Sequence, residues 1–141
     1  MNRISYLKEM ETINLTVTEF EEKYYLHDSS IEKIEYNAVD KILKLEIDFC
    51  FWMQNWYNPE EFPDGLIAVT FENVSSFEYE YHEFSNILEN LDTEVDNTKI
   101  TSDKMLEIYI REYSDSGKDL FWWIKIKAEN VTVKEISRYK A

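Results

Sequence analysis

The sequence predicts an α+β protein that is predominantly antiparallel β, with one or two short helices near its N-terminus. From residue 31 onward, apolar and polar residues alternate over most of the chain, which is the pattern of strands that bury one face. Short polar turns separate these segments, and strands joined by turns run antiparallel. The segments make about six or seven strands, which suggests a curved sheet, a sandwich or a partial barrel.

Length and charge set the class of protein. The 141 residues have the length of one ordinary domain, and an apolar fraction of 44% argues against disorder. The formal net charge is −14, from 29 acidic and 15 basic residues. Proteins that bind nucleic acids or anionic lipids usually do so through clustered Lys and Arg. We therefore expect a single domain over 1–141 with an acidic surface that binds neither nucleic acid nor a membrane.

Two helical segments are expected before the first strand. Apolar residues at helical spacing over 4–10 predict a short helix. Thr18 and Glu21 fit a capping box that opens a second helical segment, in which Phe20 and Tyr24 share one face.

The first hairpin is expected to join strands at Ile31–Tyr36 and Ile42–Trp52 around the polar turn Asn37–Asp40. In the second strand the apolar side chains share one face and the charged ones share the other, so only one side meets the core. The core-facing residues are Leu43, Leu45, Ile47, Phe49 and Phe51.

The middle of the chain has a less regular pattern of apolar and polar residues. Strands are expected over 66–71 and 77–81, with the polar interruption 73–76 between them. For 84–91 a short helix and an irregular connection both fit the spacing. The polar region 91–103 is expected to be a long exposed connection.

A second hairpin closes the chain. Met105–Tyr113 and Leu120–Ala128 are predicted strands joined by the loop Ser114–Gly117, and a last short strand at 131–133 follows a change of direction near 129–130. The residues expected in the core are Leu106, Ile108, Ile110, Leu120, Trp122, Ile124 and Ile126.

No motif has the pattern of a catalytic, cofactor or metal site. One cysteine, two histidines and two glycines are too few for a zinc cluster or a phosphate loop. Asp28 could orient His27 for acid-base work, but a polar helix-to-strand junction explains the pair more simply. With Cys50 unable to form an internal disulfide and no signal-peptide pattern at the start, we expect a cytoplasmic protein.

Aromatic residues that strand alternation does not explain are the candidates for binding a partner. Most lie in the loop expected between Trp52 and Phe62. Exposed Trp and Tyr among carboxylates are typical of a protein-binding hot spot, although they could instead close one end of the β-structure. The candidate partner-binding residues are Trp52, Trp56, Tyr57, Glu60, Glu61, Phe62, Asp64 and Trp123.

The run from Leu26 to Tyr81 combines a His27-Asp28-Ser junction, an Ile-rich strand, a hairpin into an alternating strand, and a strand ending Phe-x-x-Val at Val74. In this combination it resembles small bacterial immunity proteins of polymorphic toxin systems. The resemblance implies a non-enzymatic, cytosolic, mostly β protein that protects its producer by binding a cognate toxin. It implies no catalytic residue, and it gives the matched positions a role in the fold.

The expected function is therefore a binding protein, in its sharpest form an immunity protein that blocks a basic toxin with carboxylates placed where substrate phosphates would lie. Two alternatives stay open. One is a small-molecule-binding or catalytic β-domain whose pocket is lined by Trp52, Trp56, Tyr57 and Trp123. The other is a structural module that self-associates through the same aromatic residues.

Overall fold

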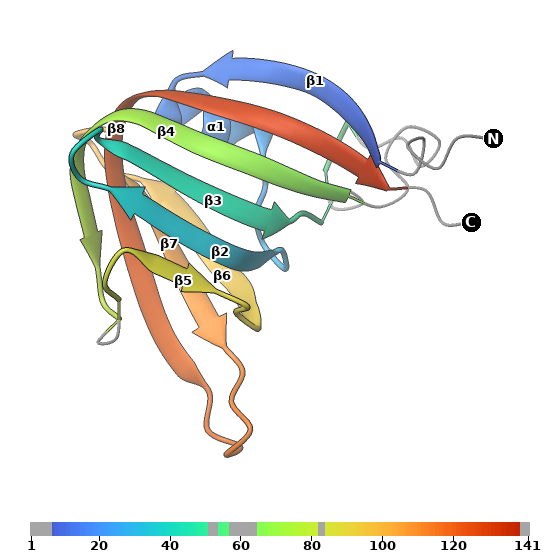
Figure 1. The fold of residues 1–141 in the computed structure, drawn as a ribbon, viewed down its shortest axis with the longest axis vertical. Coiled ribbons are helices and arrows are strands. Elements are labelled where there is room, and N and C mark those ends of the chain that lie inside the picture. The colour runs from blue at the N-terminus through green and yellow to red at the C-terminus, as the bar shows by residue number, and fades with distance from the viewer. Residues whose placement is uncertain (1–6, 51–53, 57–64, 82–83, 139–141) are drawn as a thin grey trace.

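The computed structural model describes residues 7–50, 54–56, 65–81 and 84–138, with the backbone alone at 7–11 and 136–138. They form a curled antiparallel sheet, rolled into a half-barrel, and one short helix, so the predicted fold class is confirmed (Figure 1). The strands are β1 (Leu7–Leu15), β2 (Ser30–Asn37), β3 (Ile42–Asp48), β4 (Gly65–Tyr79), β5 (Ile87–Glu89), β6 (Thr93–Ile100), β7 (Leu106–Glu112) and β8 (Leu120–Arg138), and the helix is α1 (Val17–Lys23). The strand order is β5-β2-β3-β4-β8-β7-β6, and β1 pairs with the C-terminal half of β8.

The sheet curls along its two longest strands, β4 and β8. β4 and β8 stay paired from Gly65 opposite Ser137 to Tyr79 opposite Ile124. β8 rises from its hairpin with β7 and turns over the top of the molecule to run beside β4 and β1 (Figure 1). The break predicted at 73–76 is wrong, and 131–133 belongs to β8 and is not a separate strand, because a bulge in β4 lets both strands bend without ending.

The helix begins earlier than predicted. Its N-cap is Thr16 and not Thr18: the Thr16 hydroxyl accepts a hydrogen bond from the Glu19 N–H at 3.1 Å, and the Glu19 carboxylate accepts one from the Thr16 N–H at 2.8 Å. This earlier start places Val17 on the buried face together with Phe20.

The helix predicted over 4–10 is wrong for its described part. Residues 7–15 are strand β1, which pairs with β8 from residue 131 to 138. The helical spacing rested on few apolar residues, and the free edge of β8 supplies a ladder of backbone hydrogen bonds that overrides it.

The polar region 91–103 is also not an exposed connection. It contains β6, whose Thr93 and Val95 are buried against the interior. Just before it, β5 is a three-residue edge strand paired with β2, where a helix or an irregular connection had been expected. Both strands lie at edges, which tolerate polar residues and give only a weak alternation.

One strand boundary and one expected core residue also differ from the prediction. β3 ends at Asp48, although Phe49 is buried as expected, and Phe51 lies outside the described residues. Leu120 was expected in the core but is 45% exposed, because it lies at the open end of the half-barrel where β8 begins.

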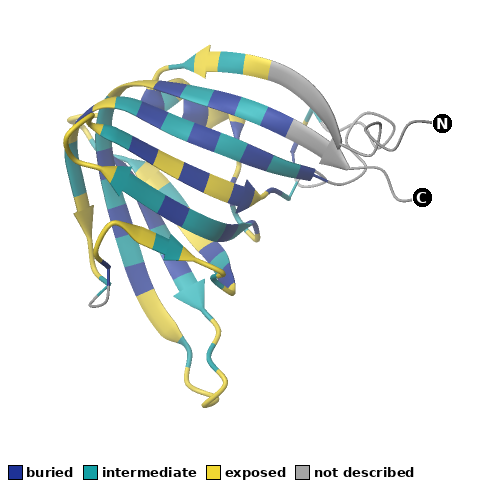
Figure 2. Ribbon diagram, in the orientation of Figure 1, coloured by how far each residue is buried: buried dark blue, intermediate teal, exposed yellow. Residues whose placement is uncertain are grey.

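The core fills the concave side of the curled sheet. Figure 2 shows buried residues alternating with exposed ones along β3, as the sequence predicts. Helix α1 covers this side, and its Phe20 ring meets Phe71 edge-on at 5.9 Å between ring centroids. Tyr24, directly after the helix, meets Phe49 in the same manner at 5.3 Å.

The two ends of the sheet are held together where β2 begins. The Val95 N–H donates to the Ser29 carbonyl at 2.8 Å, and the Asp28 N–H donates to the Val95 carbonyl at 3.1 Å. These bonds bring the His27-Asp28 junction against β6 and thereby close the curl at this point.

Candidate functional site

Trp56 packs on the end of the core. Its indole N–H donates to the Lys23 carbonyl at 3.1 Å, and its ring lies 6.0 Å from Tyr24 and 6.4 Å from Phe49 between centroids. The Lys23 ammonium lies 5.3 Å from the indole centroid. These contacts favour the role of a lid for Trp56, while its part in binding a partner stays a prediction.

The rest of this loop's candidate residues fall outside the described residues. They are Trp52, Tyr57, Glu60, Glu61, Phe62 and Asp64.

Trp123 has a different setting, on the outer side of the sheet. On β7 and β8, Tyr109 lies opposite Trp123 and Arg111 lies opposite Phe121, so the four side chains share one face. Lys125, two residues along β8, places its ammonium 4.4 Å from the Trp123 centroid. We call these five residues the aromatic face. Phe121 is its most open member, at 63% exposure.

The cations of the aromatic face are already paired with carboxylates. Arg111 donates from Nε and Nη2 to one oxygen of Asp119, at 2.9 and 2.7 Å, and this hydrogen bonding raises the pKa of Arg111. Glu107 accepts from the Tyr109 hydroxyl and lies 3.9 Å from the Lys125 ammonium. The hydrogen bond from Tyr109 is the main cause of the lowered pKa of Glu107.

Two further carboxylates flank the aromatic face on the β4 side. Glu78 lies opposite Lys125, and the Glu80 N–H donates to the Trp123 carbonyl at 3.0 Å. Both side chains are exposed, and neither forms an ion pair with another described residue. The aromatic residues therefore lie beside negative charge that is open to a partner.

The His27-Asp28 pair lies at the β6 side of this surface. His27 Nε2 is 3.3 Å from an Asp28 oxygen, and Nδ1 is within hydrogen-bond distance, 2.8 Å, of the Asp96 carbonyl. Asp28 has a positive φ of 66°, a turn conformation that Asp tolerates better than most residues. With both ring nitrogens engaged, the geometry favours a structural role over acid-base chemistry.

A network that the sequence did not indicate joins this junction to the aromatic face. The Asp28 side chain is hydrogen-bonded to Glu94, which raises the pKa of Asp28. Glu94 also accepts from the Tyr113 hydroxyl, and the hydrogen bonds from Tyr113 and Asp28 lower its pKa. The Arg111 guanidinium lies 5.2 Å from the Tyr113 centroid. Only recognition of β6 could have placed Glu94 here, since it lies opposite Arg111 in the ladder.

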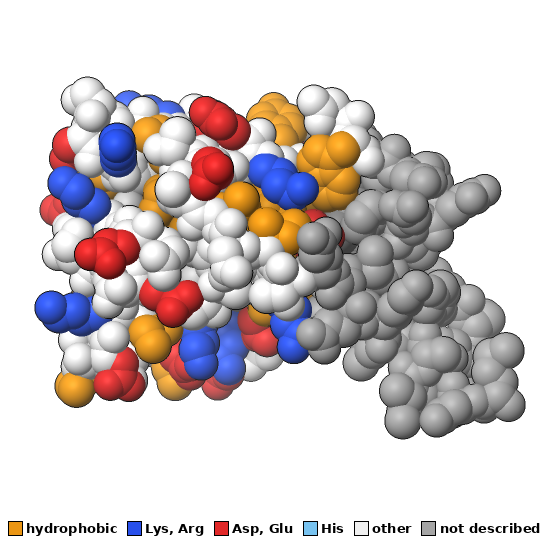
Figure 3. Space-filling model, turned by 90° about the horizontal axis from the view of Figure 1, so that it is seen from above, with side chains coloured by type: hydrophobic (Ala, Val, Ile, Leu, Met, Phe, Trp, Pro, Cys, Tyr) orange, Lys and Arg blue, Asp and Glu red, His pale blue; other side chains and the backbone are white. Residues whose placement is uncertain are grey.

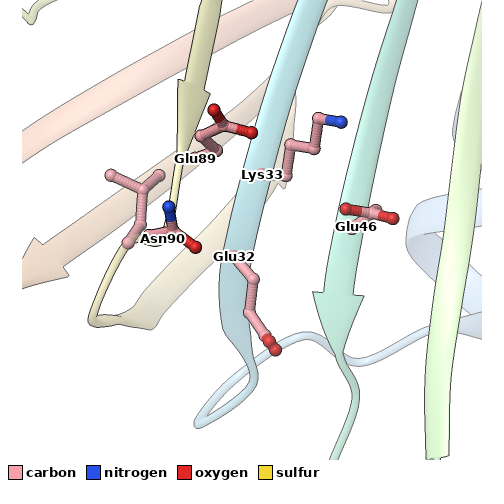
Figure 4. A pocket seen from close by; sticks show the side chains of 6 residues that line it. Glu32, Lys33, Glu46, Glu89 and Asn90 are labelled. Carbon is pink, nitrogen blue, oxygen red and sulfur yellow. The ribbon is translucent and has the colours of Figure 1, made fainter.

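A hollow lies on the outer side of β2, β3 and β5, away from the aromatic face, with a volume of about 400 Å³. Figure 4 shows Lys33 between Glu89 on β5 and Glu46 on β3. Its acidic residues thus surround a cation, and none of its described lining residues is aromatic. On the face seen in Figure 3, acidic and basic side chains are likewise interspersed. The described lining of this hollow therefore does not combine aromatic anchors with carboxylates.

Within the described part of the chain, no group of three or more His, Cys, Asp or Glu side chains is placed to hold a metal ion. No helix there is long and apolar enough to span a membrane. Comparison of the chain with protein-family models, with curated proteins and with solved structures gives no match in any of the three.

Proposed function

We propose that this protein is a non-enzymatic, cytosolic binding protein that acts as an immunity protein and neutralises a basic toxin. The observation that carries the proposal is the aromatic face, in which exposed Phe121 and half-buried Trp123 lie beside the open carboxylates of Glu78 and Glu80. The resemblance over Leu26–Tyr81 and the net charge of −14 point to the same class of partner.

The two kinds of side chain would do different work in such a complex. Aromatic residues supply most of the binding free energy when a partner removes them from water. Carboxylates at the edge attract a basic partner and set its orientation, which mainly raises the association rate. A toxin that cleaves nucleic acid must expose basic residues to its substrate, and an acidic protein bound there would exclude that substrate.

The position of the aromatic face on paired strands supports the proposal. β8 is paired with β7 on one side and with β4 over most of its length on the other, so Tyr109 and Trp123 are held in fixed register. A surface that is already ordered loses little conformational entropy when it binds.

The proposal is tested by co-expression with the toxin encoded beside this gene. Cells carrying the toxin should grow when the unaltered protein is present, and growth should fall when Phe121→Ala replaces it. Val39→Ala is the matched control, because Val39 is 91% exposed in the β2–β3 turn, away from the aromatic face. If no adjacent gene encodes a toxin, or if the unaltered protein protects against none, the proposal is wrong.

The alternative of a single aromatic pocket has less support. Trp56 lies against the core beside α1, whereas Trp123 lies on the outer side of the sheet. These two tryptophans therefore do not line one cavity.

A further inference from the structure

A groove opens where β4 ends and β8 begins. It has a volume of about 420 Å³ and is lined by Tyr79, Glu80, Tyr81, Leu120, Phe121 and Trp122. Figure 1 shows β4 ending partway down beside β8, while β8 continues below it into the hairpin with β7. The groove thus lies between the end of β4, with the two residues that follow it, and the first residues of β8.

We infer that this groove binds an extended basic segment of a partner polypeptide, with a Lys or Arg side chain lying beside its exposed rings, those of Tyr79 and Phe121. The inference rests on the proposed function for the identity of the partner, and it names the part of the surface that recognises positive charge. Three features of the groove support it.

The first feature is the chemistry of the lining. Aromatic residues form most of the walls, and no Lys or Arg is among the described residues that line the groove. Cations bind over aromatic ring faces within about 6 Å of the centroid. The neighbouring surface uses this contact already, since the Arg111 guanidinium lies 5.7 Å from the Phe121 centroid.

The second feature is the placement of carboxylates. Glu80 is exposed at the mouth of the groove and forms no ion pair with a described residue. Glu112 lies behind the rings: it accepts a hydrogen bond from the Trp122 indole N–H at 3.1 Å and one from the Tyr81 hydroxyl at 3.5 Å. The positive charge of Arg111 does not cancel the negative charge of Glu80 and Glu112, because Arg111 is paired with Asp119 at 2.7 Å.

The third feature is a stretch of strand edge that no other described residue pairs with, and it favours a polypeptide over a small cation. On the β4 side, the last backbone hydrogen bond between described residues is the one from the Glu80 N–H to the Trp123 carbonyl. No described residue pairs with β8 between Leu120 and Trp122 on that side. An extended chain could add to this edge through its backbone, while its side chains enter the groove.

The test uses a synthetic peptide of alternating threonine and lysine, followed by amide chemical shifts of the full-length protein. We expect the largest shifts at Glu80, Phe121 and Trp122. The same peptide with glutamate in place of lysine should not bind. Binding of the glutamate peptide, or shifts confined to other surfaces, would overturn the inference.

Single substitutions test whether the lysine peptide binds in the groove itself. Phe121→Ala should weaken binding of the lysine peptide by about tenfold, the size of a partly desolvated cation–ring contact. Glu80→Gln should weaken it by about twofold to fivefold, the size of an exposed ion pair. The controls Val39→Ala and Glu89→Gln change an exposed apolar residue and an exposed carboxylate elsewhere, and they should leave the affinity unchanged. Circular dichroism verifies that all four variants are folded. Equal affinities throughout would contradict the inference.

Three outcomes separate the parts of the account: the first tests the occupant of the groove, and the other two separate the groove from the proposed function. If tetramethylammonium chloride displaces the peptide and binds as tightly as the peptide does, the groove is a small-cation site and the polypeptide occupant is wrong. If the peptide binds in the groove but no toxin is neutralised, the inference about the groove holds and the immunity function fails. If the toxin is neutralised equally by Glu80→Gln and by the unaltered protein, the function holds and the groove is not where the toxin binds.

Discussion

The hydroxyl of Thr93 on β6 donates a hydrogen bond to the Ile31 carbonyl at 2.8 Å and lies 2.9 Å from the Ile31 N–H, which donates to it. Thr93 is 4% exposed. One side chain therefore satisfies both backbone groups of a buried residue on β2, in place of a neighbouring strand. This contact holds the two ends of the curled sheet together, next to the junction at Asp28.

Thr93→Val should destabilise the fold. Valine has the same shape but leaves the Ile31 N–H and carbonyl unpaired in the interior, which costs about 1–3 kcal/mol for each buried group that stays unsatisfied. Urea unfolding measures the loss. Thr98→Val is the control on the same strand, and it should stay within about 0.5 kcal/mol of the unaltered protein. Equal losses in the two variants would show that the Thr93 hydroxyl has no special role.

Tyr24→Phe should also lower stability. The Tyr24 hydroxyl donates to the Glu135 carboxylate at 2.7 Å, and both side chains are buried. A hydrogen bond to a charged group contributes about 1.5–3 kcal/mol. Tyr25→Phe removes a hydroxyl from a half-exposed neighbour and should change little. Thermal unfolding that finds Tyr24→Phe as stable as Tyr25→Phe would rule out this contribution.

Asp28→Asn should make stability less dependent on pH. The pKa of Asp28 is raised above 3.8 by its hydrogen bond to Glu94, so its contribution to stability is complete below 3.8 and is lost as pH rises through the higher folded value. The pKa of Glu94 is lowered from 4.5, so its contribution is present above 4.5 and is lost as pH falls through the lower folded value. The amide of Asn can donate to Glu94 at every pH.

We therefore expect Asp28→Asn to melt at a higher temperature than the unaltered protein at pH 7, with the difference vanishing below the ordinary pKa of 3.8. The nearby charges act on Asp28 in opposite directions, since His27 lowers its pKa and Asp96 raises it. Asp28→Ala also removes the carboxylate charge but cannot donate to Glu94 and fits the positive φ less well than Asn, so its gain should be smaller. A melting difference that is the same at both pH values would contradict the assigned cause.

Trp56→Ala and Phe121→Ala should differ in their effect on stability, because Trp56 covers the core as a lid and Phe121 lies on the proposed binding surface. Trp56 is half-buried against Tyr24 and Phe49, so its loss should lower stability by about 2 kcal/mol, less than the roughly 3–5 kcal/mol of a fully buried tryptophan. Phe121 is largely exposed, so its replacement should change stability by less than about 0.5 kcal/mol. Chemical denaturation of both variants gives the comparison. A large loss for Phe121→Ala would place it in the core and not on a binding surface.

The sequence predicts the strands whose buried face is uniformly apolar. β3, β7 and the first half of β8 belong to this class, and their inward residues such as Leu45, Ile108 and Ile124 are buried as expected. β6 was missed because only Val95 among its apolar residues is fully buried. The rest of this segment is polar, and it is a strand because its backbone pairs with β7. Tertiary pairing likewise decides β1, where a helical spacing gave the wrong structure.

The candidate site is less predictable for the same reason. Trp123 could be chosen from sequence because it falls outside the buried set of its strand. Its neighbours Tyr109 and Phe121 could not be chosen, since their meeting depends on the register of β7 against β8. The link from Asp28 to Tyr113 depends on β6 as well, a strand that the polar sequence of 91–103 concealed.

The central claim is that this protein binds a basic toxin through the aromatic face. Titration calorimetry of the purified toxin domain with the unaltered protein, Phe121→Ala and Val39→Ala tests it most directly. We predict a complex with the unaltered protein, an affinity at least about tenfold weaker for Phe121→Ala, as expected for an aromatic hot-spot residue, and no change for Val39→Ala. No complex with the unaltered protein, or equal affinities for all three, would contradict the claim.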